Sequence, residues 1–355
     1  MSQDAQRPNL AEPVRREQYL GAAFAALDLG TNNCRLLIGS PAPGGFRVVD
    51  SFSRIVRLGE GLASTGLLAE AAQDRALAAL RSCAEKLSRR PVRALHAVAT
   101  EACRRAANGP AFIARIQAET GIRLRIISAR EEAELAMESC APLLRASDRR
   151  VLLFDIGGGS TEIAWVRVPP AGEPELIGYL SVPVGVVTLS ERCGPSCFTE
   201  AGFHAVVEEV TAKLAVFDQV HRIGQEIRAG GVRLMGTSGT VTTLAGVAMS
   251  LPRYRRPLVD GQTIEAEEAD RALGDLFALG REGLAAHPCV GPDRVEFVLP
   301  GCAVYAAIRR IWPAPRLTVA DRGLREGILM RLIRADREAA PRRAWRRADA
   351  QAHPA

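Results

Sequence analysis

The segment Asp-Ile-Gly-Gly-Gly-Ser-Thr-Glu at residues 155–162 constrains the fold of this chain more than any other. One apolar run precedes it at residues 151–154 and another follows at residues 163–166. Two short apolar runs around a glycine-rich segment predict a tight turn between two buried strands, with an acid at each end of the turn. A glycine-rich hairpin with incidental acids is the alternative for this segment taken alone.

The turn carries groups that suit an oligo-anion. Consecutive glycines let a backbone adopt positive φ and approach a ligand closely, and hydroxyl groups donate hydrogen bonds to it. Asp155 and Glu162 offer hard oxygen ligands that could hold Mg²⁺ against such an anion, directly or through water. The candidate phosphate-binding residues of the turn are Gly157, Gly158, Gly159, Ser160 and Thr161.

An earlier segment, at residues 26–38, repeats this plan. Three pairs of positions align between the two segments: Asp28 with Asp155, Gly30 with Gly157, and Leu36 with Ile163. An internal repeat at the starts of two halves is harder to dismiss as chance than a single loop. The repeat therefore predicts two similar α/β lobes that each open with a strand, a turn and a second strand.

Composition sets the outer limits. The chain has 355 residues, of which 47% are hydrophobic and 24% are charged, so it has room for two packed cores. Residues 1–20 lack an apolar signal region, and no run of 18 apolar residues occurs, so we expect a cytoplasmic protein without a membrane contact. The eight cysteines are scattered, which favours reduced thiols over disulfides.

Two further patterns leave alternatives open. Cys193, Cys197 and His204 hint at a metal site, but no fourth ligand is evident, and chance spacing is the favoured explanation. The net charge is +6, and seven arginines against three acids after Met330 supply four of these charges. A basic tail can attract polyanions without specificity, but we favour a solvated C-terminus and expect no specific nucleic acid partner.

The predicted element order supports the duplication. The first half reads strand, strand, strand, helix, strand, helix, strand, helix, and the second half begins again with three strands from residue 151. We expect a disordered N-terminus at 1–20, a first domain at 21–145, a second domain at 146–333 and a basic, disordered tail at 334–355.

Such a duplication, with an Asp-x-Gly turn opening each half, resembles the actin-like ATPase superfamily of sugar kinases, heat-shock chaperones and actin. The resemblance implies two ribonuclease-H-like domains that hold phosphates between the two hairpins. Periodicity alone predicts only two α/β lobes, and the cleft between them comes from the resemblance.

Within that superfamily, the finer motifs resemble the exopolyphosphatase / guanosine pentaphosphate phosphohydrolase family over residues 24–332. The motifs that carry this resemblance are Asp28-Leu-Gly-Thr-Asn-Asn33, Arg57-Leu-Gly-Glu-Gly-Leu62, Ala99-Thr-Glu-Ala-Cys-Arg104-Arg-Ala-Ala-Asn108, Ile126-Ile-Ser-Ala-Arg-Glu131-Glu-Ala133, residues 155–162, Gly236-Thr-Ser-Gly239-Thr and Asp321-Arg-Gly-Leu-Arg-Glu-Gly327.

The resemblance implies Mg²⁺-dependent hydrolysis of terminal phosphoanhydride bonds in inorganic polyphosphate or guanosine pentaphosphate. The alternatives are a sugar or acetate kinase of the same superfamily, and a non-catalytic nucleotide-sensing or filament protein. The sequence does not rank the two substrates, and it leaves a homodimer open.

The resemblance also assigns a catalytic base, Glu131, the first glutamate of the Glu-Glu-Ala motif. A carboxylate can take a proton from the water that attacks phosphorus. The rival role is structural, because Ser128 and Glu131 have the spacing of a helix capping box. The neighbouring Glu132 and Glu138 are read as solvated helix surface.

Further residues are carried over as phosphate-binding candidates. Arg104 and Asn108 share one helix face if their segment is helical, and a guanidinium grips two phosphate oxygens with a fixed fork. The candidates outside the 155–162 turn are Asp28, Gly30, Thr31, Asn32, Asn33, Arg57, Arg104, Asn108, Gly236, Ser238 and Gly239.

Two positions depart from the family pattern, Ala129 where glycine is common and Asn33 where serine is common. An alanine forced to positive φ would be strained, so we expect the backbone that leads to Glu131 to differ from the family pattern if that position requires positive φ. The chain stops soon after Met330, as expected of a short form with two domains.

Overall fold

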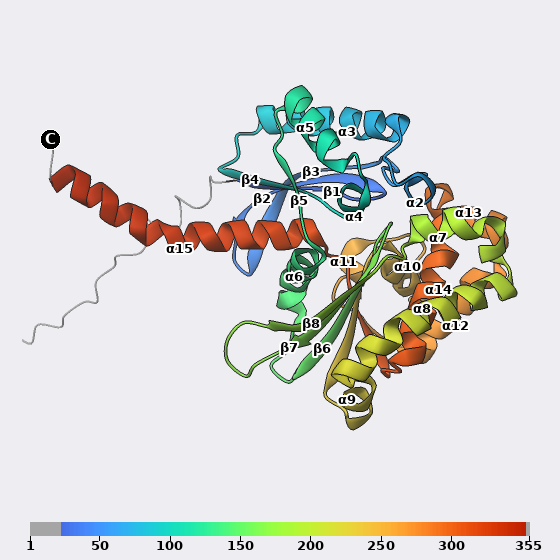
Figure 1. Ribbon diagram of the computed structural model, residues 1–355. Helices are drawn as coiled ribbons and strands as arrows, with labels where there is room; N and C mark the ends of the chain where they lie inside the picture. The colour runs from blue at the N-terminus through green and yellow to red at the C-terminus, as the bar shows by residue number, and fades with distance from the viewer. Residues whose placement is uncertain (1–22, 353–355) are drawn as a thin grey trace, which may run out of the picture.

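The computed structural model describes residues 23–352, and it consists of two lobes that each contain one mixed β-sheet (Figure 1). The N-terminal segment 1–20, expected to be disordered, lies outside the described residues. Within residues 23–352, no helix is long and apolar enough to cross a lipid bilayer.

The first lobe has a five-stranded sheet in the order β3-β2-β1-β4-β5. Its strands are β1 (Phe24–Leu29), β2 (Asn33–Ala42), β3 (Gly45–Ile55), β4 (Ala94–Ala99) and β5 (Leu124–Ile126). Its helices are α2 (Leu62–Thr65), α3 (Glu70–Arg89), α4 (Glu101–Arg105) and α5 (Gly109–Thr120). One face of the sheet packs against α3 and α5 through alternate apolar residues such as Leu27 and Leu36.

The second lobe has a six-stranded sheet in the order β10-β11-β9-β6-β7-β8. Its strands are β6 (Arg150–Ile156), β7 (Thr161–Arg167), β8 (Glu175–Val182), β9 (Val232–Thr237), β10 (Thr263–Glu265) and β11 (Arg316–Ala320). Its helices are α7 (Val186–Cys193), α8 (Glu200–His221), α9 (Ile223–Ala229), α10 (Gly239–Ala248), α11 (Arg256–Val259), α12 (Ala266–Ala278), α13 (Gly280–Ala286) and α14 (Val295–Ile311).

The duplication is confirmed at the level of strand pairing. In each lobe the first three strands pair antiparallel, and the fourth strand pairs parallel with the first. The backbone of the two turns also matches, because the N–H of Gly30 donates to the carbonyl of Asn33 at 2.9 Å and the N–H of Gly157 donates to the carbonyl of Ser160 at 2.9 Å. The two halves are therefore copies of one ribonuclease-H-like plan, as predicted.

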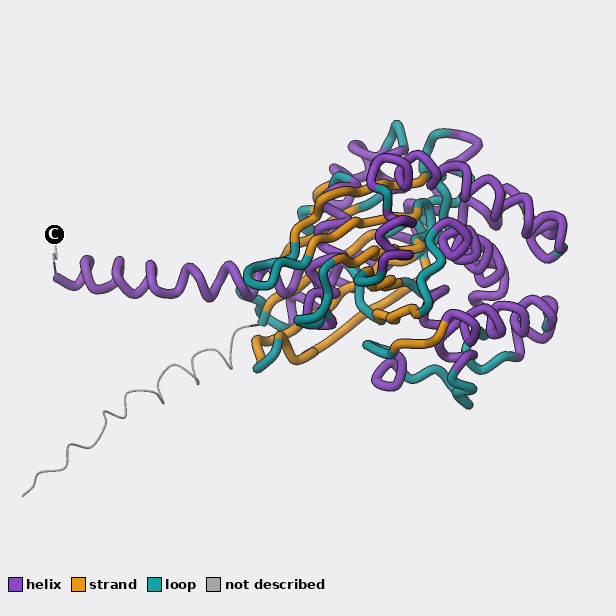
Figure 2. The backbone as a smooth tube through the Cα atoms, turned by 90° about the horizontal axis from the view of Figure 1, so that it is seen from below, coloured by secondary structure: helices purple, strands orange, loops and turns teal. Residues whose placement is uncertain are grey.

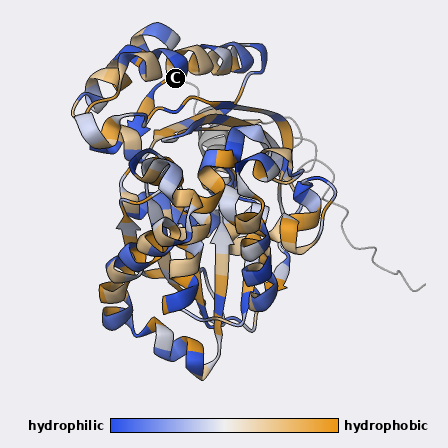
Figure 3. Ribbon diagram, turned by 90° about the vertical axis from the view of Figure 1, so that its right-hand side faces the viewer, coloured by the Kyte–Doolittle hydropathy of each residue, from blue (hydrophilic) through white to orange (hydrophobic). Residues whose placement is uncertain are grey.

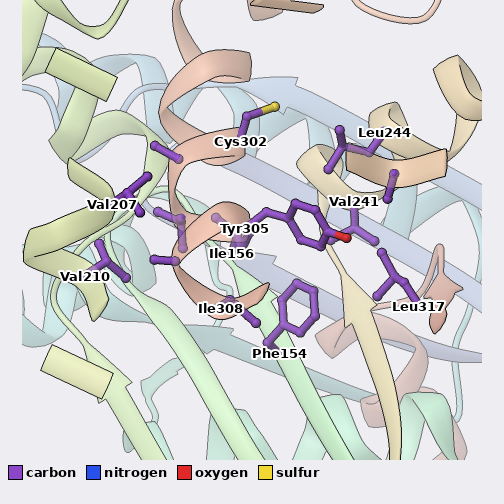
Figure 4. Packing of buried hydrophobic residues seen from close by; sticks show 14 of the residues in the cluster. Phe154, Ile156, Val207, Val210, Val241, Leu244, Cys302, Tyr305, Ile308 and Leu317 are labelled. Carbon is purple, nitrogen blue, oxygen red and sulfur yellow. The ribbon is translucent and has the colours of Figure 1, made fainter. Parts of the chain in front are cut away.

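The core of the second lobe lies between its sheet and the helices α8, α10 and α14. Phe154 and Ile156 from β6 meet Tyr305 and Ile308 from α14 there (Figure 4). Most helices carry both hydrophilic and hydrophobic residues, as expected where one face packs on a sheet (Figure 3).

Two helices lie between the sheets and connect the lobes (Figure 1). α6 (Ala129–Cys140) packs Leu135 toward the first sheet, while its small residues Ala133 and Ala136 contact the second sheet. α15 (Leu324–Ala352) follows the last strand of the second lobe but buries Ile328 and Leu329 against the first sheet. A sequence boundary at 145/146 therefore does not coincide with a division between packed cores.

The prediction of a disordered tail from residue 334 is wrong as far as residue 352, because α15 continues to Ala352 and extends beyond the rest of the molecule (Figure 2). Arg331 donates to Glu138 of α6 at 3.0 Å, and Arg334 donates to the same carboxylate at 2.9 Å. These ion pairs, with the buried Ile333, hold the middle of the helix in place. Residues 353–355 lie outside the described residues.

Candidate functional site

A cavity of about 420 Å³ lies between the lobes, and both glycine turns line it. Twelve of the site residues that the sequence predicts line this cavity: Asp28, Gly30, Thr31, Asn32, Asn33, Asp155, Gly157, Gly158, Gly159, Ser160, Ser238 and Gly239. The structure thus brings together residues from both halves of the chain that the repeat predicts to be neighbours.

The two turns touch each other, and glycine is needed where they meet. A Cβ on Gly158 would lie 3.2 Å from Cβ of Thr31, and a Cβ on Gly159 would lie 2.7 Å from its Oγ1. Behind the second turn, a Cβ on Gly185 would lie 2.5 Å from the carbonyl carbon of Gly158. Any side chain at these glycines would push the turns apart.

The backbone holds each turn from behind. The carbonyl of Asn32 accepts from the N–H groups of Val56 and Arg57, at 2.8 and 3.0 Å. The carbonyl of Gly158 accepts from the N–H of Val187 at 2.8 Å, so the N-terminus of α7 supports the second turn. Arg57 adopts a φ of 47° and contributes its backbone to this support, but its exposed side chain is not among those that line the cavity.

Asp28 and Asp155 meet in the cavity wall. Oδ1 of Asp28 is shut off from solvent and has no hydrogen-bond partner among the described residues. Burial raises the pKa of Asp28, and it raises the pKa of Asp155 to about 6, with the charge of Arg35 opposing both shifts. Two carboxyl groups that line one cavity, each with its pKa raised by burial despite Arg35, favour a cation between them.

Glu162 stands behind this wall instead of lining it. Its Oε1 accepts hydrogen bonds from the hydroxyls of Ser160 and Ser181. Burial, and next the charge of Asp155, raise the pKa of Glu162 to about 7. Thr161 likewise points into the protein, because its Oγ1 donates to the carbonyl of Val184 at 2.7 Å.

The Glu-Glu-Ala motif contributes its second glutamate to the cavity, not its first. Glu131 lies outside the cavity and accepts from Arg125 at 2.8 Å, and this contact holds the pKa of Glu131 below its usual range. Glu132 lines the cavity and is only 8% exposed, so its interpretation as solvated surface is wrong. Burial, and next the charge of Glu162, raise the pKa of Glu132 well above its usual range. The geometry therefore does not support Glu131 as the base.

The predicted helix cap at this motif is present. The Ser128 hydroxyl accepts from the N–H of Glu131 at 3.1 Å, and α6 starts at the next residue, Ala129. Ala129 does not have positive φ, so alanine is not strained there. Glu138, also read as solvated surface, instead binds Arg331 and Arg334.

Arg104 and Asn108 do not line the cavity. The Arg104 guanidinium donates to Glu132 at 3.0 Å and to Glu101 at 2.6 Å. The Asn108 amide exchanges two hydrogen bonds with the backbone of Leu68, at 2.8 and 3.0 Å. Asn108 is therefore a structural residue here, because both ends of its side chain are used inside the first lobe.

The loop of the motif at residues 236–240 lines the cavity at the N-terminus of α10. Ser238 has a φ of 114°, which is costly for a residue with a Cβ, and its buried Oγ has no partner among the described residues. Gly239 lies under the Arg294 guanidinium, where a Cβ would clash. Gly236 lies behind the loop, because a Cβ there would stand 2.5 Å from the Phe154 ring.

Five arginines and five acids are among the lining residues that the sequence analysis did not assign. No acid among the described residues lies within ion-pair distance of Arg35 or Arg294, and Arg325 reaches Glu326 only at 4.0 Å. Burial lowers the pKa of Arg294 and of Arg325, and the charge of Arg35 lowers both further. The unassigned charged or aromatic lining residues are Arg35, Glu101, Glu132, Tyr254, Arg256, Asp293, Arg294, Phe297, Asp321, Arg322, Arg325 and Glu326.

Some of these residues carried a sequence signal. Arg35 belongs to the repeated segment at 26–38, and Arg322, Arg325 and Glu326 belong to the motif at 321–327. Tyr254 and Arg294 lie outside every motif, so only the tertiary structure brings them to the cavity.

The described residues contain no group of three or more His, Cys, Asp or Glu side chains that could hold a metal ion by themselves. The hinted site at Cys193, Cys197 and His204 is therefore absent, and all eight cysteines are free thiols. Mg²⁺ needs fewer protein ligands, because it keeps several waters and binds through one or two carboxylates plus substrate phosphates. The orphaned Oδ1 of Asp28 beside Asp155 fits that requirement.

Comparison with known proteins agrees with this geometry. The profile of the Ppx/GppA phosphatase family matches residues 37–335. "Exopolyphosphatase 2" of Mycobacterium tuberculosis is 29% identical over 322 residues, which cover 87% of this chain and 98% of that protein. "Guanosine-5'-triphosphate,3'-diphosphate pyrophosphatase" of Aeromonas hydrophila is 30% identical over 318 residues, which cover 87% of this chain and 59% of that protein.

The fold agrees over nearly the same length. The crystal structure of the Aquifex aeolicus member of the Ppx/GppA protein family has a TM-score of 0.73 at 25% identity, and the match covers 89% of this chain and 98% of that one. With the profile matching most of the sequence and the paired glycine turns in place, the chain belongs to the Ppx/GppA phosphatase family and is a hydrolase of acid anhydrides.

Proposed function

We propose that this chain removes the terminal phosphate from inorganic polyphosphate or guanosine pentaphosphate, with water as acceptor and Mg²⁺ as cofactor. The observation that carries the proposal is the buried Glu132 carboxyl in a cavity walled by two glycine turns. The names of the two relatives support both substrates, and family membership favours hydrolysis over the kinase and filament alternatives.

Glu132 is suited to act as general base. An efficient base has a pKa near the working pH, and burial moves the pKa of Glu132 upward from the usual range of a glutamate. Its Oε2 accepts from Arg104, and its Oε1 accepts no hydrogen bond from a described residue. Oε1 is therefore available to take a proton from the water that attacks phosphorus.

The cation-binding role falls to Asp28 and Asp155. Bound there with water and substrate oxygens as its other ligands, Mg²⁺ would offset negative charge on the phosphates. The two carboxyl groups would gain a counter-charge beyond that of Arg35, which acts on both, and of Arg325, which acts on Asp28. Glu162 supports the site from behind through Ser160.

The anionic substrate is matched by guanidinium groups and by the turn backbones. Arg35 and Arg294 are half-buried without an acid partner among the described residues, which is costly until an anion binds. Arginine binds phosphate oxygens in a fixed fork, and the glycines of both turns let phosphate approach the backbone. We also place the activity in the cytoplasm, in line with eight unpaired thiols.

A pair of neighbouring variants tests the proposal. The purified protein is assayed for orthophosphate release from tripolyphosphate, long polyphosphate, guanosine pentaphosphate and ATP over a range of Mg²⁺ concentrations. Glu132→Gln keeps the size of the side chain but cannot accept the proton, so kcat should fall at least about 100-fold.

Glu131→Gln is the matched control, because the same change is made one residue away and outside the cavity. Its kcat should stay close to that of the unaltered protein. Normal turnover in Glu132→Gln, or an equal loss in both variants, contradicts the assignment. Activity that is unchanged in EDTA contradicts the proposed cofactor.

A further inference from the structure

We propose that Arg104 and Glu101 are positioning residues: Arg104 fixes one orientation of the Glu132 carboxylate, and Glu101 fixes Arg104. This inference rests on the proposed function, because it presumes that Glu132 acts as the base. It departs from the role that the family resemblance suggested for Arg104, which was to grip substrate phosphate.

The contacts of Arg104 are all made inside the protein. Nη1 donates to Oε2 of Glu132 at 3.0 Å and to the carbonyl of Ile127 at 2.9 Å, and Nη2 donates to Oε2 of Glu101 at 2.6 Å. Both terminal nitrogens are therefore occupied, and the side chain does not line the cavity. A guanidinium held in this way binds a carboxylate with fixed geometry.

The contact with Arg104 gives the two carboxylate oxygens of Glu132 different surroundings. Oε2 is held by Arg104, while Oε1 has no hydrogen-bond partner among the described residues. The other charges that act on Glu132 are those of Glu162 on β7 and Asp28 on β1, and both repel it. Arg104 is the cation that offsets this repulsion and keeps the carboxylate in one place.

Glu101 is itself fixed from both lobes. It is 8% exposed, and its Cγ would lie 3.1 Å from a Cβ on Gly159, the third glycine of the second turn. Arg105 approaches its other oxygen to 3.8 Å. Because the second turn lies close to the side chain of Glu101, the turn limits the movement of the acid that holds Arg104.

Substitutions at Arg104 distinguish positioning of Glu132 from binding of substrate phosphate, because the first role affects kcat and the second affects KM. With tripolyphosphate and Mg²⁺, Arg104→Met should lower kcat roughly 100-fold, the size of loss that a misplaced catalytic group can cause. KM and the inhibition constant of orthophosphate should change less than about twofold, because uniform substrate binding is intact. Arg104→Lys should recover part of kcat, since lysine can satisfy one carboxylate but lacks the fork.

Two further variants complete the set. Glu101→Gln keeps an acceptor for Arg104 and should lose kcat less than Arg104→Met does, with KM unchanged. The matched control is Arg115→Met, because Arg115 also bridges two acids, Asp74 at 2.9 Å and Glu119 at 2.8 Å, but lies outside the cavity. Its kcat and KM should equal those of the unaltered protein.

The outcomes are distinguishable. A raised KM and a raised orthophosphate inhibition constant with kcat retained would show that Arg104 binds substrate, and would overturn the inference while leaving the proposed function intact. Normal turnover in Glu132→Gln would instead remove the proposed function. If Arg104→Met does not fold, Arg104→Lys and Glu101→Gln provide the same test, because a positioning role again predicts a lower kcat with an unchanged KM.

Discussion

Asp155 carries its charge where burial opposes it, and this has a consequence for stability. Its pKa is raised from 3.8 to about 6 in the folded protein, so the folded state holds the proton more tightly than the unfolded chain does. The resulting stabilisation is complete below pH 3.8 and is lost as pH rises through about 6. Without a metal ion, the carboxyl should therefore destabilise the protein at neutral pH.

Melting temperatures in EDTA test this expectation. Asp155→Asn removes the ionisable group, so the variant should gain melting temperature relative to the unaltered protein at pH 7.5, and this advantage should shrink as pH falls from about 6 toward 3.8. The comparison between the two proteins cancels the contributions of titrating groups that do not interact with Asp155; Glu162, whose pKa the charge of Asp155 raises, changes in the same direction as the tested group. A difference that does not depend on pH would show that burial does not penalise this charge.

At the scale of elements, the second glycine turn is braced by the N-terminus of α7. A Cβ on Gly185 would lie 2.5 Å from both the carbonyl carbon and the carbonyl oxygen of Gly158, and backbone atoms cannot move away without displacing the turn. We expect Gly185→Ala to lower both the melting temperature and kcat/KM, because it shifts a loop that forms the phosphate site.

Gly274 provides the control for this substitution. It lies inside α12 with open space around the position of a Cβ. Gly274→Ala should therefore stabilise the protein by up to about 1 kcal/mol through helix propensity and leave activity unchanged. A normal Gly185→Ala protein would mean that the turn can shift without cost.

At the scale of the whole molecule, α15 ties the end of the chain to the first lobe. Among the residues whose side chains are described, those up to 336 bind the helix to the rest of the protein, including ion pairs of Arg331 and Arg334 with Glu138 and of Arg93 with Asp336 at 2.9 Å. A protein that ends at residue 339 should therefore keep its melting temperature and its turnover of tripolyphosphate.

The same truncation should weaken salt-sensitive attraction to long polyphosphate, because it removes Arg342, Arg343, Arg346 and Arg347. KM for long polyphosphate is measured across a range of salt concentrations for both proteins. A chain that ends at Met330 is the contrasting variant, and it should lose stability because it lacks Ile333 and the two arginines that bind Glu138. Equal salt dependence in full-length and 339-residue proteins would exclude a role for the tail.

Much of the fold could be predicted because its signals are local. The apolar runs on either side of the turn at 155–162 identify β6 and β7, and the repeat at 26–38 identifies β1 and β2 in the same relation. Continuous apolar runs of this length are typical of strands that are buried on both faces, and β1, β6 and β7 are buried along nearly their whole length. By contrast, β10 has only three residues and gave no sequence signal of its own.

The amino-acid sequence by itself determined the duplication and the two phosphate turns with their leading acids Asp28 and Asp155, because each turn depends on spacing within one short segment. It predicted Asp155 and Glu162 as the metal ligands, whereas in the tertiary structure Asp28, and not Glu162, lines the cavity with Asp155. The tertiary structure decided which glutamate enters the cavity. Adjacent residues on a helix point about 100° apart, and only the packing of α6 between the sheets turns Glu132 inward and leaves Glu131 to Arg125. It also decided the partners of Arg104 and the arrival of Arg294, since these contacts join segments far apart in the chain.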